Sequence, residues 1–214
     1  MTIMKEYQYY LLDWDGNLAR TLHIWLDIFR EVLAARGLHK TDREIAATFG
    51  QFSEYIKIWN LHDGDKIHEE AHSLAKQRLP ETELYPDAID VLAELKKRDK
   101  KLALITTSTH DNVAHLLDKY ELRRYFDVIV AADDVTHFKP HPEPLEKALT
   151  QLDGTPEQAV MIGDSDKDLG AAQNFGIDSI LFYPHEHDIF YDLDDLKKHN
   201  PTYVIHDFKE IIAY

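Results

Sequence analysis

Short apolar runs that alternate with helical patterns are the feature that most constrains how this chain can fold. Six runs are rich in Val, Ile, Leu and Tyr and lie at residues 7–12, 101–105, 128–131, 159–162, 179–182 and 203–205. Helical patterns lie between or after them, at residues 87–98, 111–120, 144–152, 167–175 and 207–213. Runs this short and apolar are typical of buried strands. The alternation predicts an α/β fold, with a Rossmann-like parallel sheet covered by helices on both faces.

One long segment interrupts this alternation. Residues 18–84 hold several amphipathic helical patterns, at residues 22–36, 42–49, 53–61 and 66–79, and no convincing strand. We therefore predict a small inserted all-helical cap at residues 18–84 and a core made of residues 1–17 and 85–214. Gly16, Pro80 and Pro86 mark the two connections and predict hinges there.

Charge and composition narrow the classes of partner. The 214 residues, 44% of them hydrophobic, suffice for one core and a small accessory domain. A formal net charge of -15, with scattered lysines and arginines, argues against a nucleic-acid partner. No apolar run approaches the roughly 20 residues that cross a bilayer, and the first residues do not resemble a signal peptide. We expect a cytoplasmic protein without a membrane partner, and the absence of cysteine excludes thiolate catalysis.

Two carboxylates follow the first apolar run, in the sequence Leu11-Leu12-Asp13-Trp14-Asp15-Gly16-Asn17. Open parallel sheets bind ligands at the carboxyl ends of their strands. Residues two apart in an extended chain point the same way, so Asp13 and Asp15 can face one site. Two anions so close together need a cation or a proton between them. A strand-end turn that uses Asp and Gly for its geometry explains the same residues equally well.

Hydroxyl residues and a lysine follow two later segments. The run at 101–105 leads into Thr106-Thr107-Ser108-Thr109, which indicates a helix N-terminus whose amide groups could hold a phosphoryl oxygen. Plain capping remains the commoner explanation of such a run. In the sequence 138–144, alternating prolines stiffen a loop and hold Lys139 extended. A fixed ammonium would balance carboxylates and a phosphate, whereas a lone loop lysine is usually solvated.

Two further aspartates follow the run at 159–162. Asp164 comes directly after Gly163, and Asp168 lies one helical turn later, so both can approach the same point. Mg²⁺ prefers carboxylate oxygens together with water and substrate phosphate. With Asp13 and the backbone carbonyl of Asp15, these residues form a candidate Mg²⁺ site.

In this order, the four segments resemble the four motifs of the haloacid dehalogenase-like hydrolases, in the helical-cap branch that includes phosphoglycolate phosphatases and β-phosphoglucomutases. The resemblance implies a Mg²⁺-dependent phosphatase of a small phosphorylated metabolite. It implies that Asp13 is the nucleophile that becomes an aspartyl-phosphate and that Asp15 is the general acid and base. The remaining implied roles are phosphoryl binding by Thr106, Thr107 and Lys139, and metal binding by Asp13, Asp15, Asp164 and Asp168, with Asp168 acting less directly.

Two positions of the first motif refine this resemblance: one departs from the family pattern, and the other distinguishes the chain from the dehalogenases of the family. Asn17 stands where the family usually has threonine, which bears on catalytic efficiency. Dehalogenases lack the second acid, Asp15, so the resemblance disfavours cleavage of a carbon–halogen bond. A phosphomutase of the same fold, and a receiver-like protein that is phosphorylated without turnover, remain alternatives.

Other patterns carry less weight. The sequence His68-Glu69-Glu70-Ala71-His72 matches the H-E-x-x-H pattern of zinc proteases. Zinc needs a third ligand, however, and Glu70 places a charge where the protease pattern is uncharged. By charge alone, Arg20, Arg43 and Lys57 are the cap residues that could read the substrate. The stretch at 185–188 is predicted to be a solvated loop.

Overall fold

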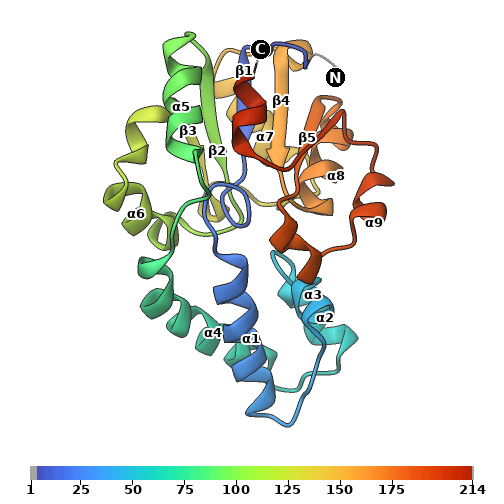
Figure 1. Cartoon of the computed structure of the whole chain (residues 1–214). Helices are drawn as coiled ribbons and strands as arrows, with labels where there is room; N and C mark the ends of the chain where they lie inside the picture. Colours follow the sequence, from blue (N-terminus) through green and yellow to red (C-terminus); the bar gives the residue numbers. More distant parts are fainter. Residues whose placement is uncertain (1–3, 214) are drawn as a thin grey trace.

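The computed structural model describes residues 4–213 and contains one six-stranded parallel sheet in the order β3-β2-β1-β4-β5-β6 (Figure 1). The strands are β1 (Tyr9–Leu12), β2 (Lys101–Ile105), β3 (Val128–Val130), β4 (Ala159–Gly163), β5 (Asp178–Phe182) and β6 (Tyr203–Ile205). Each predicted strand is present to within two residues, and the α/β fold is confirmed. The strand order reverses at β1, between β2 and β4, so ligands are expected at the carboxyl ends of these three strands.

Helices cover both faces of the sheet. They are α5 (Ala88–Lys97), α6 (His110–Lys119), α7 (Glu143–Gln151), α8 (Asp166–Phe175) and α9 (Leu193–Lys197). Because successive strand residues point to opposite faces, Leu12 packs with α5 and α6, whereas Leu11 packs with α7 and α8. The predicted helix at 207–213 forms instead as a 3-10 helix, η6 (Phe208–Ile212).

Four helices fold outside the sheet layers, at the lower end of the molecule in Figure 1. They are α1 (Leu22–Ala34), α2 (Asp42–Ala46), α3 (Phe52–Ile58) and α4 (Gly64–Arg78). Leu22, Leu26, Phe29 and Leu33 form the apolar stripe of α1. This stripe belongs to a hydrophobic cluster of its own, which also takes Phe190 from the sheet-bearing part. The separate cluster supports our proposal that residues 18–84 form a cap on a core of residues 1–17 and 85–214.

The two connections between these parts lie side by side. The Tyr85 amide donates to the Leu18 carbonyl at 3.0 Å, and the Arg20 amide donates to the Glu83 carbonyl at 3.0 Å. Gly16 precedes the first connection with a φ of +75°, a conformation that other residues rarely adopt. Short 3-10 helices complete the fold: η1 (Leu79–Glu81), η2 (Leu122–Tyr125), η3 (Ala132–Asp134), η4 (Pro156–Gln158) and η5 (His185–Ile189). Within residues 4–213, no helix is long and apolar enough to cross a membrane.

Candidate active site

Asp13 and Asp15 lie where β1 leaves the sheet. The Asp13 amide donates to the Ile162 carbonyl of β4 at 2.9 Å, and the residue is only 6% exposed. The buried Trp14 anchors the following turn, because its carbonyl accepts hydrogen bonds from the amides of residues 17, 18 and 19. Both carboxylates line one cavity of about 470 Å³, as the two-residue spacing predicted.

Asn17 joins the ends of the two central strands. Its side-chain nitrogen donates to the Asp13 carbonyl at 3.0 Å and to the Ile162 carbonyl at 3.1 Å, and the residue is fully buried. A threonine hydroxyl has a single proton to donate, so it could not make both bonds. The departure from the family pattern therefore has a local structural role in this chain.

Lys139 is the cation at the centre of the site. Its ammonium donates to Asp13 Oδ1 at 2.6 Å, to Asp168 Oδ1 at 2.5 Å and to the Ile105 carbonyl at 3.2 Å. Burial opposes its charge, but Asp13 and Asp168 raise the pKa of Lys139 overall, so the amine stays protonated. The loop thus directs the lysine inward, as its prolines predicted.

The carboxylates of the site outnumber its cation. Burial, and then the charge of Asp168, raises the pKa of Asp13 to about 8, although Lys139 lowers it. Burial, together with the charges of Asp168 and Asp13, raises the pKa of Asp164 well above its ordinary value. Ionising all three carboxylates against Lys139 leaves two uncompensated negative charges in a buried space.

These residues fit a divalent cation. Ligand oxygens of Asp13, Asp164 and Asp168 lie within 4.8 Å of one another, and Asp164 Oδ2 is buried without a hydrogen-bond partner. Asp168 differs from the other two because protein donors reach both of its oxygens: Lys139 bonds Oδ1, and the amide and hydroxyl of Ser165 bond Oδ2. The geometry therefore favours Asp13 and Asp164 as direct ligands and Asp168 as the residue that orients Lys139.

The hydroxyl run after β2 divides into two parts. Thr107, Ser108 and Thr109 line the cavity, whereas Thr106 is buried and its hydroxyl accepts a hydrogen bond from the Ser108 amide at 3.0 Å. Thr109 caps α6, as the capping interpretation predicted. The structure thus brings Thr107 to the site directly and gives Thr106 a role in shaping the turn.

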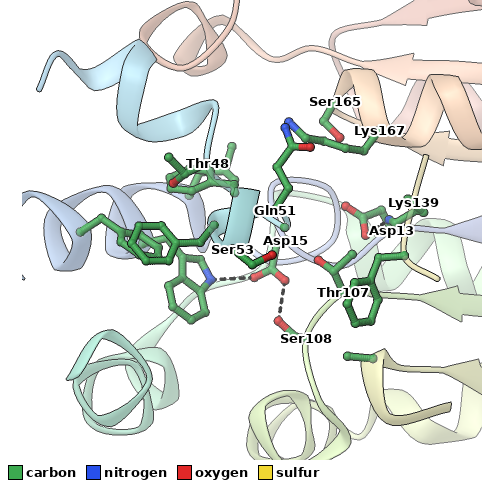
Figure 2. A pocket seen from close by; sticks show the side chains of 18 of the residues that line it. Asp13, Asp15, Thr48, Gln51, Ser53, Thr107, Ser108, Lys139, Ser165 and Lys167 are labelled. Atoms are coloured by element: carbon green, nitrogen blue, oxygen red, sulfur yellow. Dashed lines mark hydrogen bonds and ion pairs between the residues drawn. The ribbon is translucent and has the colours of Figure 1, made fainter. Parts of the chain in front are cut away.

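Three contacts were not predicted from the sequence. The indole Nε1 of Trp25, from α1, donates to Asp15 Oδ1 at 3.1 Å, and the Ser108 hydroxyl donates to Asp15 Oδ2 at 2.9 Å (Figure 2). Tyr191 also lines the cavity, next to Asp164, whose charge helps to raise the tyrosine's pKa after burial. No local sequence signal marks Trp25 or Tyr191, because only the tertiary fold brings their side chains to the site.

The structure also tests two histidine-containing patterns of the sequence. His68 and His72 both line the cavity, but no group of three metal-ligating side chains within residues 4–213 includes either. The prediction of a solvated loop at 185–188 is wrong in part. His185 and Asp188 are exposed, but the segment forms η5, and His187 is completely buried and hydrogen-bonded to the Tyr85 hydroxyl at 2.7 Å. Burial lowers the pKa of His187 to about 3, so the ring stays neutral and can lie among aromatic side chains.

Comparison with known proteins identifies the family. The model of the haloacid dehalogenase-like hydrolases matches residues 10–182. A pyrophosphatase PpaX of Bacillus cereus is 34% identical over 170 residues, which cover 78% of each chain.

Solved structures agree with this result. A structure from Bacteroides fragilis that carries the same family name has a TM-score of 0.84 and 27% identity, covering 94% of this chain and 98% of its own. CbbY from Rhodobacter sphaeroides, solved with xylulose-(1,5)bisphosphate, has a TM-score of 0.76 and 29% identity, covering 94% and 95%. The chain therefore belongs to the haloacid dehalogenase-like hydrolases.

Proposed function

We propose that this protein is a Mg²⁺-dependent phosphatase that hydrolyses a small phosphomonoester through an aspartyl-phosphate on Asp13. The observation that carries the proposal is the buried contact between Asp13 and Lys139 beside the unpartnered carboxylate oxygen of Asp164. Phosphoryl transfer depends mainly on positioning and charge neutralisation, and this arrangement supplies both. Phosphatase-named relatives support the same reaction class.

In the first step, a carboxylate oxygen of Asp13 bonds to phosphorus as the bond from phosphorus to the alcohol oxygen breaks. Asp15, oriented by Trp25 and Ser108, gives its proton to the departing oxygen. In the second step, Asp15 takes a proton from water, whose oxygen attacks phosphorus and frees Asp13 and inorganic phosphate.

Groups around the phosphoryl oxygens would balance their charge. The raised pKa of Lys139 keeps its amine protonated, and Thr107, Ser108 and Thr109 line the same cavity. A cation held by Asp13, the Asp15 carbonyl and Asp164 would offset the remaining negative charge.

Phosphate release from a panel of phosphomonoesters, with Mg²⁺ and with EDTA, tests the proposal. We expect turnover that requires Mg²⁺ and falls at least about a thousandfold in Asp13→Asn, because the amide is a poor nucleophile. Asp118→Asn is the matched control, since Asp118 is exposed on α6 and pairs only with Arg123 among the ion pairs of the described residues. Turnover that survives in Asp13→Asn would contradict the proposed nucleophile.

A further inference from the structure

The cavity over Asp13 has two chemically different ends. Its core end holds Asp13, Asp15, Ser108, Lys139 and Asp164. Its cap end is lined largely by rings, which come from Trp25, Phe29, Phe49, Phe52, His68 and His72. Figure 2 shows Thr48, Gln51 and Ser53 on the cap side of the space, opposite Asp13 and Lys139. A phosphomonoester bound to Asp13 would therefore place its alcohol part towards the cap.

The cap supplies no fixed cation to the cavity. Lys167, from α8, does line the cavity, but it already pairs with Asp166 at 3.0 Å. Within residues 18–84, all of which the structure describes, no lysine or arginine lines the cavity. Arg20 is paired with Glu186 at 2.8 Å, and Arg43 lies 3.5 Å from Asp192, so neither reads the substrate as their charge suggested. Lys57 is exposed and lies outside the lining as well.

His72, one of the two histidines in the lining, does not supply a positive charge. Burial, with the charge of His68, lowers the pKa of His72, so its ring is neutral at neutral pH. The ring centroids of His68 and His72 lie 4.3 Å apart. A carboxylate or second phosphate on the alcohol part would be desolvated there and would have to compete with Asp166 for Lys167, which is costly.

The rings form a continuous wall. Phe29 lies with its ring centroid 4.9 Å from that of Phe52 and 6.1 Å from that of Trp25, both at interplanar angles near 30°. His68 stacks on Phe52 at 6.1 Å, and His72 meets Trp25 edge-on at 5.7 Å. Such surfaces favour flat rings, by stacking and by apolar burial. The cavity of about 470 Å³ also falls within the usual range for ligands larger than a pair of phosphates.

We propose that the alcohol part of the substrate is uncharged and carries a flat aromatic ring, which binds against Trp25, Phe29 and Phe52 in the cap. This inference rests on the proposed phosphatase function and narrows its substrate class. It separates this chain from relatives named for pyrophosphate or crystallised with a sugar bisphosphate, whose ligands carry a second phosphate.

The test compares three phosphate esters of primary alcohols, and pyrophosphate, under one set of conditions. We expect kcat/KM for 2-phenylethyl phosphate to exceed that for 2-phosphoglycolate, and that for pyrophosphate, by at least about tenfold. Cyclohexylethyl phosphate, which is apolar but not flat, should lie between them. Comparable or higher kcat/KM for the two substrates that carry a second anionic group would overturn the inference while leaving the phosphatase function intact.

A variant that adds a positive charge to the cap end tests whether the lack of an unpaired cation there causes this selectivity. His68→Lys adds an ammonium to the cap end and should raise kcat/KM for 2-phosphoglycolate about tenfold without raising that for the phenylethyl ester. His62→Lys is the matched control, because His62 is exposed in the cap and lies outside the cavity lining. Equal effects of the two variants would contradict a charge-selective cap end.

Failure of the proposed function gives a distinct result. In that case no ester is turned over with Mg²⁺, and equilibrium binding to Asp13→Asn replaces the rate measurement. Tighter binding of 2-phenylethyl phosphate than of 2-phosphoglycolate would still support the inference, and the opposite order would overturn it.

Discussion

Replacing Asp13 by asparagine should change how the stability of the metal-free protein depends on pH. Asp13 has a pKa of about 8 in the folded protein and an ordinary value of 3.8. Between these values the folded protein holds one proton more than the unfolded chain. The free energy of unfolding of the wild type therefore falls as pH rises, by about 1.4 kcal/mol per pH unit for this one group.

Between pH 5 and pH 7 the contribution of Asp13 amounts to about 3 kcal/mol, or a shift in Tm of roughly 6–12 °C for a chain of this size. Asparagine cannot ionise, so the Asp13→Asn variant should lose this part of the slope. Urea unfolding in EDTA at several pH values measures it, with Asp118→Asn as a variant that keeps the wild-type slope. Mg²⁺ should restore stability mainly at the higher pH, where the carboxylates are free to bind it. Parallel pH dependences of wild type and Asp13→Asn in EDTA would refute the assignment of a buried, protonated Asp13.

Three other substitutions probe how the site is held. Trp25→Phe keeps a ring in the cap but removes the hydrogen-bond donor to Asp15. We expect kcat to fall about tenfold with little change in KM, and the pH–rate profile to shift. An unchanged profile would show that the indole does not position the acid. Asn17→Ala removes two hydrogen bonds to buried carbonyls and should lower the free energy of unfolding by about 2–4 kcal/mol. Urea unfolding measures this loss, and a loss below about 1 kcal/mol would contradict the bridging role. Gly16 has a φ of +75°, and Gly16→Ala places a methyl group against the Asp164 carboxylate. We expect the affinity for Mg²⁺, measured by calorimetry, to fall at least tenfold. An affinity equal to that of the wild type would rule out this close approach.

The core of this fold was predictable because its signals are local. The strands are short apolar runs buried on both faces, and such runs identify themselves without knowledge of their partners. The four chemical segments were found for a related reason, since three of them directly follow a strand and the sheet brings the strand ends together. Lys139 was found through its flanking prolines, which restrict the backbone whatever surrounds it.

Residues whose roles depend on tertiary contact were missed. Trp25 is one apolar residue among several on α1, and only the docking of the cap brings its indole to Asp15. The histidines at 185–188 look solvated in the sequence, yet Tyr85 and the neighbouring aromatic rings bury His187. The charges of Arg20 and Arg43 suggested substrate binding, but acidic residues outside the cap already pair with them.

In the mechanism that we propose, the cap contributes to the chemistry as well as to the enclosure of the site. Trp25 reaches Asp15 from the cap, and Phe190, which packs into the cap cluster, precedes the Tyr191 that lies against Asp164. A rotation of the cap about the paired connections at 18–20 and 83–85 would break the first contact and loosen the second. The acid and a metal-binding carboxylate would then lose their orientation at the moment when water enters the cavity. Coupling these two events would restrict phosphoryl transfer to the closed state, in which the electrostatic interactions of the site are strongest.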